Sequence, residues 1–187
     1  MKSTTLSTIL LRIELLHIEP LIWRRARVPE RWTLRRLHGV IQKVFGWEDR
    51  HLHDFRIGDV RIGMPEMDDS EAGLQDDREW TLAEVLMTGA QEFVYVYDFG
   101  DHWEHRLIVE PESRTEAGAG FAPICLAGEN AAPPEDIGGP PGYELFLEAL
   151  GDPQHARHDE MIEWVGGVFD PRAFDLNRVN RDLKKRR

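Results

Sequence analysis

Alternating apolar residues along residues 8–17 constrain the fold more than any other feature of the sequence. Successive side chains of a strand point to opposite faces, so one face collects five residues: Ile9, Leu11, Ile13, Leu15 and His17. A second extended run covers residues 21–28 and ends at Pro29. Because only a short turn separates the two runs, we expect antiparallel neighbours with one buried face.

Three further patterns add strands and helices to this pair. Thr33 is a favourable N-cap for a helix over residues 33–45, in which apolar residues recur every three or four positions. Hairpins are expected within residues 52–62 and 93–109, which are rich in β-branched and aromatic residues. The spacing of Thr81-Leu82-Ala83-Glu84 is that of a capping box and predicts a short helix.

The C-terminal part of the chain is predicted to be helical. Three ranges carry the pattern: residues 143–150, residues 153–165 with Asp152 as N-cap, and residues 176–185. Residues 64–79 are acidic and residues 111–142 are rich in Pro, Gly and Ala, so both are expected to be exposed connections. The predicted fold class is α+β, with a largely antiparallel sheet built from hairpins, helices packed on one face and a helical C-terminal end.

Length and composition favour one soluble domain over residues 1–187, with a basic tail from about residue 178. The chain has 187 residues, of which 41% are hydrophobic, and this is enough for one packed core. No apolar run approaches the roughly 20 residues that cross a bilayer, and the first residues lack a secretory signal. Cys125 is the single cysteine, so a reducing, cytoplasmic location is expected.

Charge is distributed unevenly, and this bears on nucleic-acid binding. The net charge is −11, yet residues 20–62 carry ten Lys and Arg against five Asp and Glu. An acidic total disfavours indiscriminate binding to phosphates, whereas a local basic face can still bind them. The candidate nucleic-acid contacts in the basic N-terminal segment are Arg24, Arg25, Arg27, Arg35 and Arg36. The alternative is a solvated surface with internal ion pairs.

Histidines and aspartates gather at two predicted strands. If the second hairpin has a four-residue loop, Asp98 lies opposite Trp103 and projects from the same face as His105. Alternate residues of a strand also face one way, which joins His51 with His53. The candidate ligands for zinc, manganese or iron are His51, His53, Asp98, Asp101 and His105. Their spacing matches no metalloenzyme signature, and the aspartates can instead bond loop amides.

Polar loop residues also suggest a surface for a protein partner. The candidates are Asp98, Asp101, His102, Trp103 and His105 in the hairpin, with Glu135 and Asp136 in the Pro-Pro-Glu-Asp loop. Asp98 or Asp101 could form an acid/base pair with His105. No nucleophile elbow or Gly-rich phosphate loop accompanies these residues, which weighs against an enzyme.

Several motifs together resemble a known family. They occur in the following order: Ile22-Trp23-Arg24-Arg25, His51-x-His53-x-Phe55, Tyr97-Asp98-Phe99-Gly100-Asp101-x-Trp103-x-His105, the run from Cys125 to Tyr143, and Asp170-Pro171-x-x-Phe174-Asp175. Over residues 8–180 the sequence resembles the plasmid pRiA4b ORF-3-like family. The resemblance implies an α+β fold and occurrence on plasmids, chromosomes and insertion elements, with no established activity. Relatives often have cysteines at the positions of Cys125, Ala132 and Ile137, which implies a thiolate site in them, but this chain keeps only the first.

Three functional hypotheses follow from the sequence. The leading one is a non-enzymatic binding or accessory protein that contacts a protein partner, has no cofactor and is associated with mobile elements. The alternative is a hydrolase of phosphate esters that depends on a divalent metal such as zinc or manganese. The third is a nucleic-acid-binding protein. No interaction with membranes is expected.

Overall fold

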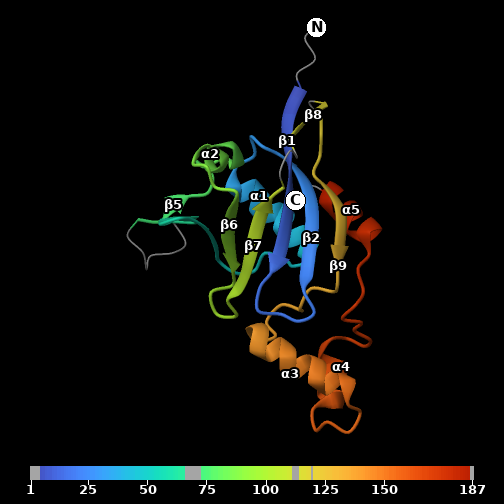
Figure 1. The fold of residues 1–187 in the computed structure, drawn as a ribbon. Helices are drawn as coiled ribbons and strands as arrows, with labels where there is room; N and C mark the ends of the chain where they lie inside the picture. Colours follow the sequence, from blue (N-terminus) through green and yellow to red (C-terminus); the bar gives the residue numbers. More distant parts are fainter. Residues whose placement is uncertain (1–4, 66–72, 111–113, 119, 186–187) are drawn as a thin grey trace.

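The computed structural model describes residues 5–65, 73–110, 114–118 and 120–185. Within these ranges the chain forms one nine-stranded sheet in the order β5-β4-β3-β6-β7-β1-β2-β9, with β8 paired to β1 (Figure 1). The strands are β1 (Thr5–Leu15), β2 (Ile22–Pro29), β3 (His53–Ile57), β4 (Val60–Gly63), β5 (Gln75–Asp76), β6 (Glu92–Tyr97), β7 (Trp103–Val109), β8 (Thr115–Gly118) and β9 (Ile124–Glu129). All pairs except β4–β5 are antiparallel.

The helices cover one face of the sheet and extend it at one end. They are α1 (Leu34–Phe45), α2 (Leu82–Met87), α3 (Gly139–Gly151), α4 (His158–Trp164) and α5 (Leu176–Lys184). Figure 1 shows α1 and α5 behind the sheet, with α3 and α4 projecting beyond its lower edge. The predicted α+β class is therefore confirmed. None of the helices within the described ranges is long and apolar enough to cross a bilayer.

The first predicted strand pair forms the centre of the core. β1 and β2 are antiparallel, with Ile13 opposite Arg24 and Leu11 opposite Ala26. The alternating residues of β1 are at most 2% exposed: Ile9, Leu11, Ile13 and Leu15. His17 instead lies exposed in the turn with a positive φ of 63°. The expected buried face is confirmed from Ile9 to Leu15.

Helix α1 begins and ends as its sequence indicates. The Oγ of Thr33 accepts a hydrogen bond from the amide of Arg36, and Gly46 ends the helix with φ 81°. The apolar face of α1 packs on the sheet, where Leu34, Leu37 and Ile41 are at most 1% exposed. These capping bonds satisfy amides that would otherwise lack partners.

The stretch over residues 111–142, predicted to be an exposed connection, contributes two strands to the sheet. It contains β8 and β9, and β9 pairs with β2, although the register shifts between Arg25 and Ala26. In β9, Cys125 is buried while Ile124 and Leu126 are more than a third exposed. Backbone hydrogen bonds to β2 hold β9 in the sheet. The residues of β9 therefore show little of the pattern by which a strand is predicted. Residues 111–113 and 119 of the connection lie outside the described part of the chain.

The C-terminal helices have different limits from those predicted. Helix α3 begins at Gly139, with prolines in its first turn, where a missing amide hydrogen costs no helical bond. Helix α4 begins at His158 rather than at residue 153, and Asp152 caps the end of α3 instead. Arg186 and Arg187 of the predicted basic tail lie outside the described residues.

The second hairpin has a loop one residue longer than predicted. Tyr97 pairs with Trp103, and Tyr95 pairs with His105, which leaves residues 98–102 as the loop. Asp98 and His102 both have a φ of 56°, and this backbone accommodates the fifth residue. Because a shift of one residue exchanges the two faces of a strand, His105 points into the core. The prediction that Asp98 and His105 share a face is wrong.

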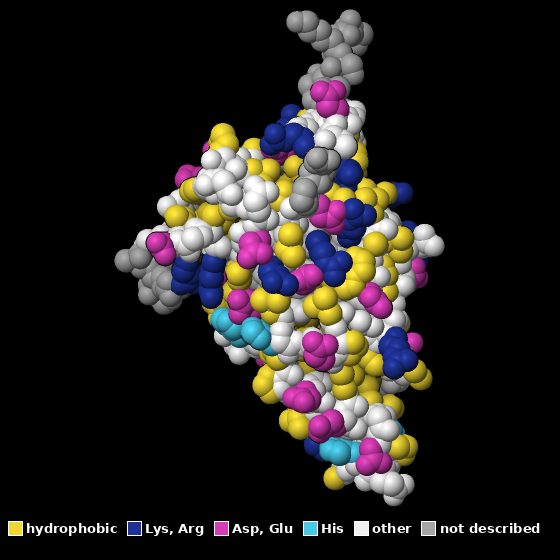
Figure 2. Space-filling model, viewed as in Figure 1, with side chains coloured by type: hydrophobic (Ala, Val, Ile, Leu, Met, Phe, Trp, Pro, Cys, Tyr) yellow, Lys and Arg dark blue, Asp and Glu magenta, His cyan; other side chains and the backbone are white. Residues whose placement is uncertain are grey.

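The face of the sheet opposite α1 carries charges of both signs. Glu14 is held by Arg12 and Arg106, at 2.6 and 2.7 Å, and Arg25 forms an ion pair with Glu110. Figure 2 shows Lys and Arg side chains interspersed with Asp and Glu side chains across this face. The acidic and basic groups therefore neutralise one another locally.

Candidate functional site

Three segments that are distant in the sequence meet at one end of the sheet. They are residues 49–52 before β3, the hairpin tip at residues 98–102, and the loop at residues 133–138 before α3. We call this surface the loop junction. Its centre consists of His51, Asp98 and Asp136, whose nearest ligand atoms all lie within 4.8 Å of one another.

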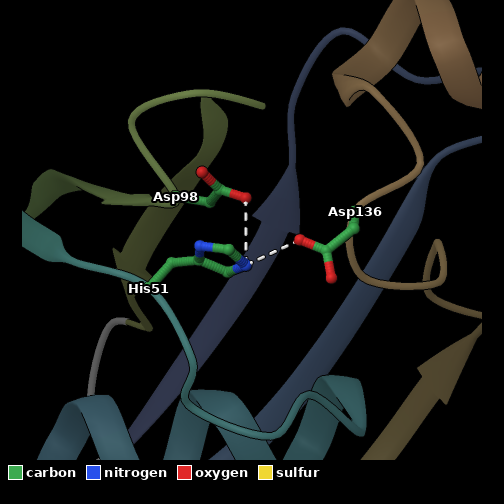
Figure 3. Close-up of side chains that lie close together, drawn as sticks. All are labelled: His51, Asp98 and Asp136. Atoms are coloured by element: carbon green, nitrogen blue, oxygen red, sulfur yellow. Dashed lines mark hydrogen bonds and ion pairs between the residues drawn. The ribbon is translucent and has the colours of Figure 1, made fainter.

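Both carboxylates of the loop junction point at the same ring nitrogen (Figure 3). The Nε2 of His51 lies 2.8 Å from Oδ1 of Asp136 and 3.5 Å from Oδ2 of Asp98. His51 and Asp136 are 85 residues apart in the chain. The side chain of Asp98 is 11% exposed, that of His51 is 30% exposed and that of Asp136 is 53% exposed. The cluster is thus anchored on one side and open to solvent on the other.

The hairpin tip fixes the position of Asp98. Its Oδ1 accepts hydrogen bonds from the amides of Gly100 and Asp101, at 3.0 and 3.3 Å. Its own amide donates to the carbonyl of Leu52, just after His51. Oδ2 is therefore the oxygen that faces His51. The predicted role of Asp98 in bonding loop amides and its predicted place among the ligands are compatible.

The loop at residues 133–138 packs directly on the hairpin tip. The amide of Gly138 donates to Oδ2 of Asp101 at 3.1 Å. Gly139 has a φ of 68°, and a Cβ atom there would lie 2.3 Å from the carbonyl oxygen of Asp101. Only glycine tolerates both this φ and this close approach. Asp136 is consequently held next to Asp98 by backbone contacts.

Substitution Gly139→Ala is expected to separate the two loops. The added Cβ meets backbone rather than a flexible side chain, so the loop must shift at a cost of about 1–3 kcal/mol. Gly151→Ala is the matched control, because a Cβ at Gly151 meets no atom within 4 Å. Thermal unfolding followed by circular dichroism measures both. Equal melting temperatures for the two variants would contradict the close contact between the loops.

A buried tyrosine and carboxylate tie the loop junction to the core. Tyr97 donates its hydroxyl hydrogen to Oε1 of Glu135 at 2.7 Å and accepts from the amide of Arg50 at 3.0 Å. Burial, together with the negative charge of Glu135, raises the pKa of Tyr97. Trp47 donates its indole hydrogen to the carbonyl of Pro133 at 2.9 Å. The tyrosine therefore stays protonated and acts as a structural donor.

The structure does not bring His53 together with His51, although the two were predicted to ligate one ion. His53 begins β3 and is buried, with its ring stacked on His38 at a centroid distance of 3.6 Å. Its Nε2 donates to Oδ2 of Asp77 at 2.9 Å. His51 lies in a bend before β3, which begins at His53, so the rule that alternate strand residues share a face does not apply to His51.

His105 and Trp103 lie in the core rather than on the surface of the loop junction. Both are at most 1% exposed, and His105 packs against Phe45 and Trp47 with centroids 4.8 and 5.3 Å apart. Its Nδ1 donates to the carbonyl of Trp103 at 3.1 Å, and burial lowers its pKa to about 3. A buried neutral ring can bind neither a surface ion nor a partner. His102, at the hairpin tip, lies beside Glu104.

A buried network next to the loop junction was not predicted from the sequence. His38 donates from Nε2 to Asp49 at 2.7 Å and accepts at Nδ1 from the hydroxyl of Tyr95 at 2.8 Å. Asp77, predicted to lie in an exposed loop, has a fully buried side chain that binds His53 and Arg35. His38 lies among the buried residues of α1, and its spacing from the apolar residues of the helix could have predicted its burial. Nothing local in the sequence indicated the burial of Asp77.

The predicted basic residues do not form one continuous face. Arg24 is 3% exposed and bonds backbone carbonyls. Arg25 pairs with Glu110, Arg27 donates to the hydroxyl of Thr115, and Arg35 pairs with Asp77. Arg36 is exposed, with its guanidinium 5.2 Å from the ring centre of Trp32. Among the five, Arg24 is unavailable for contact with a phosphate.

Comparisons with known proteins find similarity over nearly the whole chain. The family model described as plasmid pRiA4b ORF-3-like protein matches residues 7–178. "Uncharacterized protein y4hQ" from Sinorhizobium fredii is 41% identical over 177 residues, covering 94% of this chain and 90% of that protein. The crystal structure of "Protein of Unknown Function MM3350" from Methanosarcina mazei Go1 is 36% identical, with a TM-score of 0.81 over 92% of this chain and 97% of that one.

Proposed function

The chain belongs to the plasmid pRiA4b ORF-3-like protein family, and since neither relative is named for an activity, we propose a function from the geometry of the loop junction. The protein is a non-enzymatic binding protein whose contact surface is organised by one divalent cation. The observation that carries this proposal is the convergence of His51, Asp98 and Asp136 from three segments on one point. Its association with mobile elements remains a prediction from the family resemblance.

The ligand set suits zinc or manganese. One imidazole nitrogen and two carboxylate oxygens are ligands that both metals accept. Zinc bonds of about 2.1 Å place tetrahedral ligand atoms roughly 3.4 Å apart, close to the 3.5 Å between His51 and Asp98. Oδ1 of Asp136 lies only 2.8 Å from Nε2 of His51, because it accepts a hydrogen bond from that nitrogen. A cation would replace that proton, with a small outward movement of Asp136.

The surroundings of the cation favour a partner with an acidic group. Three protein ligands leave at least one coordination position open, on the side where Asp136 is exposed. A hollow of about 450 Å³ adjoins Asp136, and its lining includes Arg50, Trp164 and Phe169. Trp164 is 46% exposed. A carboxylate of a protein partner would complete the coordination sphere, while its apolar neighbours would contact the aromatic rings.

Metal binding is tested by titrating the metal-free protein with Zn²⁺ and Mn²⁺ in a calorimeter. We expect one site per chain, and a loss of affinity of more than about tenfold in both His51→Ala and Asp136→Asn. Asn tolerates the positive φ of 61° at residue 136, so the second variant removes charge without straining the loop.

His17→Asn is the control for metal titration, because it removes an exposed imidazole at another positive-φ position. Its affinity should equal that of the unmodified protein. Absence of binding by the unmodified protein at micromolar metal, or equal affinity in all variants, would refute the proposal.

A metal-dependent hydrolase is the second candidate. Three protein ligands with an open position also characterise catalytic zinc sites, and the exposed Arg50 of the loop junction could orient a phosphate. Incubation of the metal-loaded protein with p-nitrophenyl phosphate and its diester tests this function. Turnover that disappears in His51→Ala but persists in His17→Asn would establish the hydrolase and overturn a non-enzymatic role.

A further inference from the structure

A groove lies between α1, α5 and residues 121–123, and Asp49 is the one lining residue that it shares with the loop junction. It encloses about 810 Å³, and we call it the basic groove. Its lining includes five cationic side chains: Arg35, Arg36, Lys43, Lys184 and Lys185. They come from the two basic ends of an otherwise acidic sequence, which the fold brings together. Asp49 is the carboxylate in this lining, and its Oδ1 is bonded to His38.

Some cations of the basic groove form ion pairs with carboxylates of the protein, and others do not. Arg35 pairs with the buried Asp77, and Lys185 pairs with Asp182 at 2.6 Å. Arg36 and Lys184 are exposed and form no ion pair with any residue in the described part of the chain. One lies on α1 and the other on α5, so unneutralised charge stands on both walls. A negatively charged ligand complements this arrangement.

Aromatic surface accompanies the charge. The guanidinium of Arg36 stacks over Trp32, and Phe121, which also lines the basic groove, is partly exposed. Bases of nucleic acids stack on aromatic rings and on guanidinium planes, while neighbouring cations bind phosphates. We propose that the basic groove binds single-stranded nucleic acid, with a base on the Trp32–Arg36 stack and the backbone between Arg36 and Lys184.

The shape of the basic groove favours a single strand over the other anionic ligands. Reading the bases of a duplex requires an element that protrudes into one of its grooves, whereas this site is concave and can hold the bases of a single strand. A free nucleotide is usually held at a Gly-rich loop or at a helix N-terminus, and the basic groove is formed by the sides of α1 and α5. The cations are spread over both walls, which suits a chain of phosphates.

Fluorescence anisotropy with labelled 12-nucleotide DNA and RNA single strands tests this site. The double variant Arg36→Ala/Lys184→Ala is expected to raise Kd at least tenfold. Loss of two phosphate contacts should also flatten the slope of log K against log salt by about 1.4. Both side chains are exposed, so thermal unfolding should be unchanged.

A control variant removes the same charge elsewhere. Arg157→Ala/Arg172→Ala lowers the net charge by two on exposed residues outside the basic groove, and its Kd should stay within twofold of the unmodified protein. His51→Ala should also retain binding, because the loop junction is a different site. The inference fails if the unmodified protein binds no strand at 50 mM salt, if the control weakens binding equally, or if duplex DNA or a free nucleotide binds as tightly.

Discussion

Arg24→Ala is expected to lower the free energy of unfolding by at least about 3 kcal/mol. The guanidinium donates to the carbonyls of Val44 and Asn130, at 2.9 and 2.8 Å, and to two further carbonyls. It also lies 5.1 and 4.5 Å from the ring centres of Phe45 and Phe174. Its removal leaves buried carbonyls without donors and opens a space between α1, β2 and β9.

Urea denaturation with linear extrapolation measures the effect of this substitution. Arg25→Ala is the control, since the adjacent arginine lies on the other face of β2 and forms a half-exposed ion pair with Glu110. Such pairs contribute about 1 kcal/mol or less. Burial lowers the pKa of Arg24 to about 10, so its side chain stays charged at neutral pH. Equal losses at the two positions would show that the carbonyl network is unimportant.

Acid is expected to destabilise the protein strongly between pH 6.5 and about 4. Burial lowers the pKa of His38 to about 4, against an opposing hydrogen bond to Asp49, and that of His105 to about 3. In the unfolded chain both imidazoles titrate near 6.5. The unfolded state therefore binds up to two more protons in this window, and stability falls as the pH falls, by up to about 2.7 kcal/mol per pH unit.

Urea denaturation at pH 7.5, 6.5, 5.5 and 4.5 measures this pH dependence. His105→Leu should lower the slope by about 1.4 kcal/mol per pH unit, because one buried imidazole is removed. His17→Asn should leave the slope unchanged, since the side chain of His17 is 62% exposed. The groups that face the two rings are Asp49, Tyr95, His53 and Arg35 for His38, and Tyr95 and Arg24 for His105. A flat profile above pH 4.5 would contradict the buried neutral state of both histidines.

Local patterns were sufficient wherever one face of an element meets the core. The alternation in β1 predicted its buried face, and the Thr33 cap with the apolar spacing that follows it predicted α1. The hairpin of β6 and β7 was also predicted, but its register was not. Loop length decides the register of a hairpin. The loop has one residue more than predicted, because Asp98 and His102 adopt positive φ. No periodicity in the sequence encodes that choice of backbone conformation.

The candidate metal site was also only partly predictable from the sequence. The sequence identified His51 and Asp98 as candidate metal ligands and Asp136 as a candidate partner contact, but it grouped His51 with His53 and Asp98 with His105. In the structure His53 and His105 are buried, whereas Asp136 joins His51 across 85 residues. The contact of Gly139 with the carbonyl of Asp101 places the two loops together. Spacing in the sequence carries no record of such a contact.

The sequence by itself determined the family, the fold class, the central strand pair and α1. The family follows from the order of the motifs. The fold class, the strand pair and the helix depend on which face of a local element is apolar, and the hydrophobic effect acts on that pattern directly. Only the tertiary structure decided which polar residues share a site: Asp98 and Asp136 at the loop junction, Arg36 and Lys184 in the lining of the basic groove, and Asp77 and His53 in the core. These groupings depend on register and on loop backbone geometry, which arise when distant segments pack together.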